Sequence, residues 1–161
     1  MILANASGIP RQNHSGPAPN TPPLQRLYRW LMPYWQPPGF FRWKLGTLLL
    51  DPTRLSSARL REFENMNNWR GRLREAELRT GAYTSGDTRA ILRRVRVPTL
   101  IQWSTHSTYL AATEAEVFQA WMPHAPTEVI LYPQAGHLMV LDAPDATGRD
   151  ARAFLDRTVG V

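Results

Sequence analysis

The sequence predicts an α/β fold with a parallel sheet, because two short apolar runs flank a helical pattern. The first run, Val97 to Trp103, is closed by Ser and Thr residues, as is typical of a buried parallel strand. The second run covers Glu128 to Tyr132. Between them the apolar residues recur at helical spacing, and Pro123 ends that pattern. The order strand, helix, strand is that of a parallel α/β unit.

Thr113 is the predicted N-cap of the helix between the two strands. Glu116 stands three residues later, which is the spacing of a capping box. Val117, Ala120 and Trp121 then share one helical face. We therefore expect an amphipathic helix that begins next to Thr113.

A single histidine follows the second predicted strand. Pro133 to Gly136 can continue neither a strand nor a helix, so we expect His137 on a loop at the C-terminal end of that strand. Gly136 is expected to allow a tight turn there. Sites in α/β proteins form at this edge of the sheet, which makes His137 the leading candidate for function.

The composition is that of one ordinary globular domain. The chain has 161 residues, of which 43% are hydrophobic and 20% are charged. It has no cysteine, which excludes disulfides and thiolate chemistry. The start lacks the pattern of a signal peptide and no stretch reaches membrane-spanning length, so we predict a cytoplasmic protein with no membrane partner. His14, His106 and His124 show no metal-ligand spacing, and we expect no metal.

The positive charge lies in the first part of the chain. Residues 1–96 hold 16 of the 19 basic and 6 of the 13 acidic residues, and the net charge of the whole chain is +6. A basic half could bind nucleic acid. However, its arginines alternate with glutamates at helical spacing, which favours a solvated helical face instead. We expect no nucleic-acid partner.

The first half predicts one strand remnant and several helices. Met1 to Ala4 is typical of the end of a strand, and residues 10–38 hold 8 of the 14 prolines, with one short helix expected over Leu24 to Leu31. Asp51 and Pro52 should start a helix with an apolar face. Further helices are expected around residues 73–78, and over Thr88 to Arg94 with Asp87 or Ser85 as the cap. For the helix that starts at Asp51 and Pro52, the residues expected on the apolar face are Leu55, Leu60, Phe63 and Met66.

Aromatic residues are concentrated between residues 30 and 43. Such a density of aromatic side chains has to cover something apolar. One interpretation is that they pack this segment onto the sheet, and the other is that some of them form the wall of an apolar substrate pocket. The residues are Trp30, Tyr34, Trp35, Phe40, Phe41 and Trp43.

Several motifs in order resemble the C-terminal portion of α/β-hydrolase-fold proteins. From Ile91 onward they are P-T-L-I-Q-W, V-I-L-Y-P, A-G-H and D-A-P, and I-L-A-N-A-S-G-I-P at the start resembles the strand that leads into the lid of that family. The resemblance implies a partial α/β-hydrolase fold, with a helical lid followed by the last two parallel strands and their flanking helices. The implied parts are a strand remnant at 1–9, a lid at 10–96 and a C-terminal core at 97–161.

The same resemblance implies that His137 is the general base, with Trp35, Phe40 and Leu138 in contact with substrate. Its expected partners are missing. No serine has the G-x-S-x-G pattern of the nucleophile. Ser107 stands where the family's W-G-x-x-D motif has its acid, and an alternative acid position lies near Asn5, an amide. Asp142 precedes the proline of the last helix, where a capping role is expected.

Two functional hypotheses remain from the sequence. In the first, the chain is a C-terminal fragment of a hydrolase that acts, when complete, on a small apolar ester or related bond without a cofactor. In the second, it is a non-catalytic remnant or binding module that keeps the lid. In both cases the Val97 strand is expected to expose its backbone edge and both faces, which predicts self-association or a complementing N-terminal half.

Overall fold

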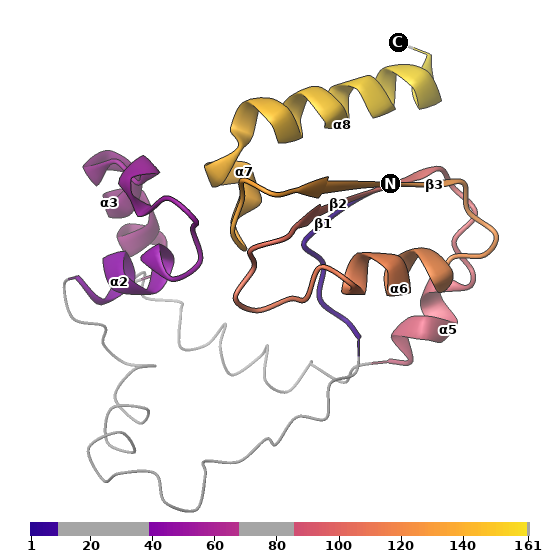
Figure 1. Cartoon of the computed structure of the whole chain (residues 1–161), viewed down its shortest axis with the longest axis horizontal. Helices are drawn as coiled ribbons and strands as arrows, with labels where there is room; N and C mark the ends of the chain where they lie inside the picture. Colours follow the sequence, from indigo (N-terminus) through magenta and orange to yellow (C-terminus); the bar gives the residue numbers. More distant parts are fainter. Residues whose placement is uncertain (10–38, 68–85, 161) are drawn as a thin grey trace, which may run out of the picture. The chain divides into compact units, whose positions relative to one another are not determined.

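A computed structural model describes residues 1–9, 39–67 and 86–160 (Figure 1). These residues belong to two compact units. Residues 1–9, 45–54 and 86–160 form the first unit, which contains the sheet, and residues 39–44 and 55–67 belong to the second. The predicted helices at 24–31 and 73–78 lie outside the described residues.

A parallel sheet of three strands is the centre of the first unit, which confirms the predicted α/β class. The strands lie in the order β1-β2-β3, with Leu3 opposite Ile101 and Ile101 opposite Val129. Every residue of β2 is buried. The bounds are Ile2–Ala4 for β1, Thr99–Ser104 for β2 and Thr127–Tyr132 for β3.

The expectation that the strand after Val97 exposes one edge and both faces was wrong. β2 is the middle strand, and its two edges pair with β1 and β3. Helix α6 (Glu114–Ala120) covers one face of the sheet and helix α8 (Pro144–Val159) covers the other (Figure 1). The three residues of β1 therefore supply the neighbour that β2 needs.

The caps of the short helices differ from one another. In α5 (Thr88–Leu92) the carboxylate of Asp87 accepts the N–H of Ala90 at 3.1 Å, so Asp87, one of the two predicted caps, is the N-cap. Thr113 does occupy the N-cap position of α6, but its side chain makes no capping hydrogen bond. Its backbone is helical (φ −63°, ψ −18°), whereas a capping side chain needs an extended residue to reach the free N–H groups. The predicted capping box was therefore wrong.

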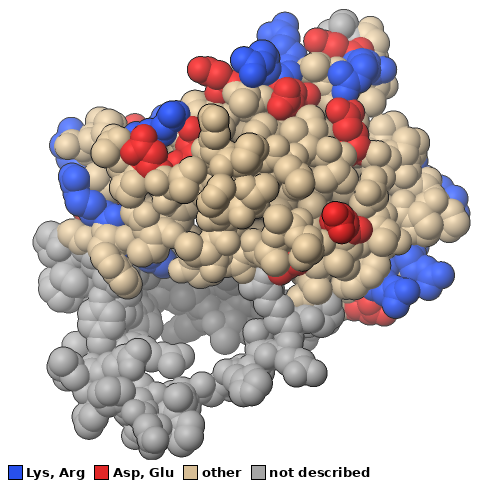
Figure 2. Space-filling model, in the orientation of Figure 1, with Lys and Arg blue, Asp and Glu red and all other residues tan. Residues whose placement is uncertain are grey.

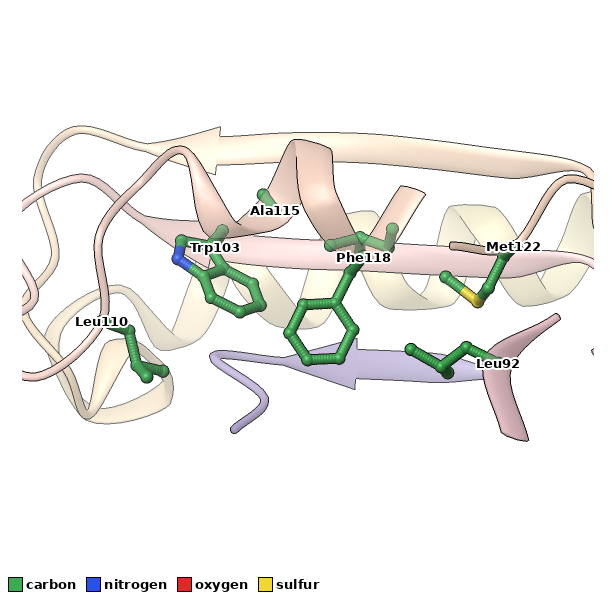
Figure 3. Close-up of a cluster of buried hydrophobic side chains, with 7 residues drawn as sticks. Leu92, Trp103, Leu110, Ala115, Phe118 and Met122 are labelled. Atoms are coloured by element: carbon green, nitrogen blue, oxygen red, sulfur yellow. The ribbon is translucent and has the colours of Figure 1, made fainter. Parts of the chain in front are cut away.

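The main hydrophobic core lies between the sheet and α6 (Figure 3). Trp103 is its largest member and is fully buried. Its ring packs against that of Phe118 with centroids 5.4 Å apart, and its indole N–H donates to the carbonyl of Ala111 at 3.0 Å. The buried N–H thus has the partner that a buried indole requires. The core consists of Leu92, Ile101, Trp103, Leu110, Ala115, Phe118 and Met122.

A buried polar chain fixes α8 on the other face of the sheet. Gln102 is buried, and its amide donates to the hydroxyl of Tyr132 at 2.8 Å and to the carbonyl of Thr147 at 2.9 Å. Tyr132 in turn donates to Asp150 at 2.7 Å. On the face shown in Figure 2, charged side chains gather over α8, whereas the surface over β3 and α6 is largely uncharged.

The remaining described helices lie between residues 40 and 67. The carboxylate of Asp51 accepts the N–H of Thr53 at 3.0 Å, but the turn that it caps (η1, Pro52–Arg54) is a short 3₁₀ helix. The α-helix predicted from this point begins only at α3 (Ser57–Asn67). Leu55 and Leu60 are buried as predicted, whereas Met66 is 70% exposed. Helix α2 spans Phe40–Gly46, and none of the described helices is long and apolar enough to cross a membrane.

Candidate functional site

Three polar residues lie at the carboxyl ends of the three strands. Asn5 follows β1, Ser107 lies in the loop after β2, and His137 lies in the loop after β3. Parallel strands bring their carboxyl ends to one edge of the sheet, so the topology alone gathers these loops. This edge is the candidate site.

The imidazole of His137 is held by Ser107. The Ser107 hydroxyl oxygen lies 3.1 Å from Nδ1 of the ring. The ring of Tyr109 packs at a centroid distance of 5.3 Å and an angle of 42°. His137 is half-buried, and burial lowers the pKa of its side chain below the usual 6.5. The neutral imidazole is therefore the favoured form at neutral pH.

Ser107 is itself fixed by the backbone of its own loop. Its oxygen accepts the N–H of Tyr109 at 3.2 Å and the N–H of Leu110 at 3.0 Å. Leu110 is part of the hydrophobic core, which keeps its backbone in place. Serine hydroxyls commonly close such local turns with their own backbone. The side chain that contacts Nδ1 is therefore rigidly placed.

Asn5 ties the histidine loop to the sheet. Its amide nitrogen donates to the backbone carbonyl of His137 at 2.7 Å and to the Ser104 hydroxyl at 3.0 Å. Its amide oxygen accepts the N–H of Ser104 at 2.9 Å. Asn5 has φ +41°, a left-handed conformation that asparagine tolerates better than most residues. A carboxylate could not donate to the His137 carbonyl, so this position requires an amide.

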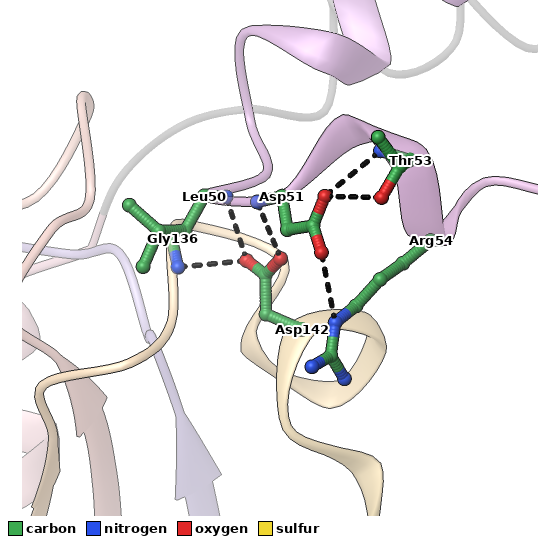
Figure 4. A network of polar contacts seen from close by, with 6 residues as sticks. All are labelled: Leu50, Asp51, Thr53, Arg54, Gly136 and Asp142. Atoms are coloured by element: carbon green, nitrogen blue, oxygen red, sulfur yellow. Dashed lines mark hydrogen bonds and ion pairs between the residues drawn. The ribbon is translucent and has the colours of Figure 1, made fainter.

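Asp142 connects the histidine loop to a distant segment (Figure 4). Its buried carboxylate accepts the backbone N–H of Gly136 at 2.7 Å, of Leu50 at 2.9 Å and of Asp51 at 3.2 Å. It is the last residue of α7 (Met139–Asp142). The prediction that Asp142 caps the last helix was wrong, because the carboxylate is occupied by N–H groups from outside α8, and α8 has no side-chain cap.

The segment Thr47–Asp51 makes further hydrogen bonds to both site loops. The N–H of Leu138 donates to the carbonyl of Leu48 at 3.1 Å. The hydroxyl of Thr108, in the loop after β2, donates to the carbonyl of Thr47 at 3.1 Å. This segment therefore supports the loops of both His137 and Ser107.

Position 136 requires glycine because the backbone of another segment passes close to it, and not because of a positive φ. Its φ is outside the left-handed region, in contrast to Gly8, Gly39 and Gly160. A Cβ atom here would lie 2.7 Å from the nitrogen of Leu50, 2.8 Å from the oxygen of Leu48 and 2.9 Å from the carbonyl carbon of Leu49. Only a residue without a side chain fits against this segment.

The other sequence-predicted site residues are less defined. Leu138 is half-buried next to His137. Trp35 lies outside the described residues, and Phe40 lies in α2 with a side chain that is not described. His106 and His124 are exposed, and among the described residues no cluster of His, Asp and Glu side chains could hold a metal ion. The substrate contacts of Trp35, Phe40 and Leu138 stay predictions.

Sequence reasoning missed the role of Asn5 and the contribution of Thr47–Asp51. The sequence indicates Asn5 only as a possible position of a catalytic acid, yet its side chain donates to the backbone of the histidine loop. The apolar run L-L-L of the supporting segment carries no motif that indicates a contact with the histidine loop. A polar residue directly after a predicted strand was the available signal for Asn5, whereas nothing in the sequence indicated the backbone pairing of residues 47–51.

The lowered pKa of His137 predicts a pH dependence of stability. The neutral ring is favoured in the folded state, so between the folded pKa and about 6.5 the unfolded chain binds more protons. The free energy of unfolding should therefore fall as the pH is lowered below 6.5 and level off below the folded pKa. Urea titrations of the parent and of His137→Gln at several pH values measure this. His124→Gln changes an exposed histidine, and this matched control should keep the pH dependence of the parent. A pH dependence that is unchanged in His137→Gln would contradict the prediction.

Comparison with solved structures identifies the architecture. A bacterial membrane phospholipase A matches with a TM-score of 0.66 and 18% identity, over 99% of this chain and 49% of that chain. A thermophilic esterase from Thermogutta terrifontis matches with a TM-score of 0.66 and 18% identity, over 98% of this chain and 55% of that chain. Naproxen esterase from Bacillus subtilis matches with a TM-score of 0.61 and 20% identity, over 81% of this chain and 45% of that chain.

These matches define the class of fold as α/β hydrolase. The chain has part of that fold and spans about half the length of the solved structures that it matches. At these sequence identities the likeness shows the fold alone. No protein-family model and no curated protein matches the chain. Its structural similarity is to lipases and esterases, and its own activity is a separate question.

Proposed function

We propose that this chain is the C-terminal part of a hydrolase that cleaves a small apolar ester or related bond when complete. The observation that carries the proposal is the placement of His137 at the carboxyl end of a parallel sheet, with Nδ1 held at 3.1 Å by Ser107 and the loop backbone held by Asn5. A general base needs such a fixed ring with one nitrogen left for the reacting group. Nε2 is the atom that would serve, in those rings that carry their proton on Nδ1.

In this proposal the chain supplies the base and its support, but not the nucleophile. His137 would take the proton of a nucleophilic hydroxyl from another part of the complete protein and return it to the leaving group. No serine of this sequence lies in a G-x-S-x-G motif. We therefore expect the 161 residues alone to be inactive.

The proposed substrate is apolar because the neighbours of His137 are uncharged. Ser107 contacts the ring nitrogen, Tyr109 packs against the ring, and Leu138 is the next residue in the chain. Charged substrates would lack a counter-charge among these neighbours. The aromatic residues between Trp30 and Trp43 extend the same proposal, with Trp35 and Phe40 as substrate contacts.

One observation favours a second candidate, a non-catalytic binding module. The residue at Nδ1 of His137 is a serine, so no negative charge stabilises a protonated ring from this side. The carboxylate of Asp142 is engaged by three backbone N–H groups. A protein that only binds a ligand at this edge would need neither an acid nor a nucleophile.

A partner that completes the sheet is part of the proposal. β1 lies at one end of the strand order and pairs with β2 alone among the described strands. An edge strand offers free backbone groups to another strand. We propose that this edge receives an N-terminal half, in the same polypeptide or another, or else a second copy of the chain.

The test begins with the intact mass of the native gene product, compared with 18.4 kDa for these residues. That product is then assayed with p-nitrophenyl butyrate and, for contrast, with p-nitrophenyl phosphate. We expect turnover of the ester, and a loss of about 10²–10⁴-fold in His137→Ala, the range for a general base. His124→Ala is the matched control and should keep full activity.

Two results would overturn this proposal. Turnover of the phosphate alone would exclude the apolar substrate. Ester hydrolysis that is equal in His137→Ala and in the parent would remove the histidine from the reaction. Absence of hydrolysis, combined with a native mass of 18.4 kDa, would favour the binding module.

A further inference from the structure

The hydroxyl of Ser107 has three hydrogen-bond partners, and together they define where its proton points. A serine hydroxyl offers two lone pairs and one proton. The N–H groups of Tyr109 and Leu110 are donors only, and they approach the oxygen at 3.2 and 3.0 Å. They occupy the two lone pairs. The proton is then available for the third neighbour, Nδ1 of His137, at 3.1 Å.

We propose that Ser107 is a positioning residue that holds the neutral His137 ring with its proton on Nε2. Because Nδ1 accepts a hydrogen bond from the Ser107 hydroxyl, it has to be the unprotonated nitrogen of a neutral ring. The other nitrogen then carries the hydrogen. The ring consequently presents an N–H donor at Nε2, suited to a carbonyl oxygen of a ligand.

The opposite arrangement conflicts with the geometry around Ser107. If Nδ1 carried the proton, the Ser107 oxygen would have to accept three N–H groups with two lone pairs. Neither backbone donor can readily move away from this oxygen. Leu110 is anchored in the core, and Thr108, which precedes Tyr109, donates its hydroxyl to the carbonyl of Thr47. Asn5 binds the backbone carbonyl of His137 and does not hydrogen-bond to its ring. Ser107 is therefore the residue that determines which ring nitrogen carries the proton.

An aspartate at position 107 would reverse the direction of the hydrogen bond between this residue and Nδ1 of His137. A carboxylate only accepts hydrogen bonds, so it would draw the ring proton to Nδ1 and leave Nε2 free to accept one. In the Ser-His-Asp triad, exchange of the acid for its amide leaves the geometry intact and lowers kcat by about 10⁴ through the wrong tautomer. Ser107 should likewise lower the fraction of His137 rings in which Nε2 is free to act as a base. This catalytic consequence rests on the proposed hydrolase function, whereas the tautomer does not.

The tautomer is measurable by long-range ¹H–¹⁵N NMR of the labelled protein at a pH where His137 is neutral. We expect the Nε2–H form to exceed the Nδ1–H form by about tenfold, the equivalent of one net hydrogen bond. Exposed His124 serves as the internal reference for an unconstrained ring. A ring of His137 protonated at Nδ1, or averaged to the same extent as that of His124, would overturn the proposal.

Two variants separate the role of Ser107 from a general effect of the loop. Ser107→Ala removes the donor, and the His137 ring should then average between tautomers as His124 does. Ser107→Asp should move the proton to Nδ1 or produce the doubly protonated ring. If Ser107→Asp does not fold, the alanine variant still decides, and an unchanged Nε2–H signal in Ser107→Ala would refute the assignment.

The same variants distinguish this inference from the proposed function. The NMR measurement requires no turnover, so a protein that hydrolyses no ester leaves the tautomer result intact. If the complete protein does hydrolyse p-nitrophenyl butyrate, Ser107→Asp should raise kcat by at least about tenfold with little change in KM. A raised KM with unchanged kcat would contradict a positioning role.

Discussion

Asp142→Asn should lower the free energy of unfolding by about 2–5 kcal/mol, because it leaves buried backbone donors without acceptors. The oxygen Oδ2 of Asp142 accepts from both Gly136 and Leu50, and Oδ1 accepts from Asp51. An amide keeps one oxygen and turns an NH₂ group toward the donors of the other. Asp142 is 3% exposed, so water cannot replace the lost acceptor.

Urea unfolding followed by tryptophan fluorescence measures this loss, and hydrogen exchange at Gly136, Leu50 and Asp51 localises it. Asp145→Asn is the matched control. Asp145 is exposed in the first turn of α8, where its charge contributes only about 0.3–1 kcal/mol through the helix dipole. A loss in Asp142→Asn no larger than in the control would show that the network of Figure 4 does not hold the histidine loop.

Gly136→Ala should destabilise the fold by about 2–3 kcal/mol, at the upper part of the usual range for overpacking. The added Cβ would meet three backbone atoms of Leu48, Leu49 and Leu50 at 2.7 to 2.9 Å. Backbone cannot move aside as the end of a flexible side chain can. The strain should also shift the backbone signals of His137, which directly follows.

Gly148→Ala provides the control for this substitution. Gly148 lies inside α8, and a Cβ there would meet nothing within 4 Å. Alanine at an open helical position should raise the free energy of unfolding by about 0.5–1 kcal/mol. The two glycines should therefore respond with opposite signs. A stabilising or neutral Gly136→Ala would refute the close approach of Leu48–Leu50 to the histidine loop.

Both predictions concern the same feature, the support of His137 by a segment about ninety residues earlier in the chain. Gly136 contacts that segment from the histidine loop, Asp142 from the end of α7, and Thr108 from the loop after β2. The position of the ring thus depends on backbone pairing remote from the ring itself. Loss of this support should reduce binding or catalysis at the site even though every side chain of the site remains.

The sequence by itself determined the three strands and the loop of His137. Apolar runs bounded by polar or Pro residues are local signals, and the strands at Thr99–Ser104 and Thr127–Tyr132 follow them closely. Asp87 was found as a cap because capping involves neighbouring residues only. The capping box at Thr113 failed because the backbone of that residue is already helical, after a turn in which the N–H of Glu114 donates to Ala111 and that of Ala115 to Ala112.

Only the tertiary structure decided how the site is held together. Asp142 and Gly136 are explained by their contacts with Leu48–Asp51. Asn5 is explained by its hydrogen bonds to Ser104 and His137. Such pairings join residues separated by about 90 to 130 positions, and backbone donors and acceptors are the same in every residue type. Their partners therefore leave no pattern in the sequence. The direction of the Ser107 hydroxyl likewise depends on two backbone N–H groups that only the folded loop brings to it.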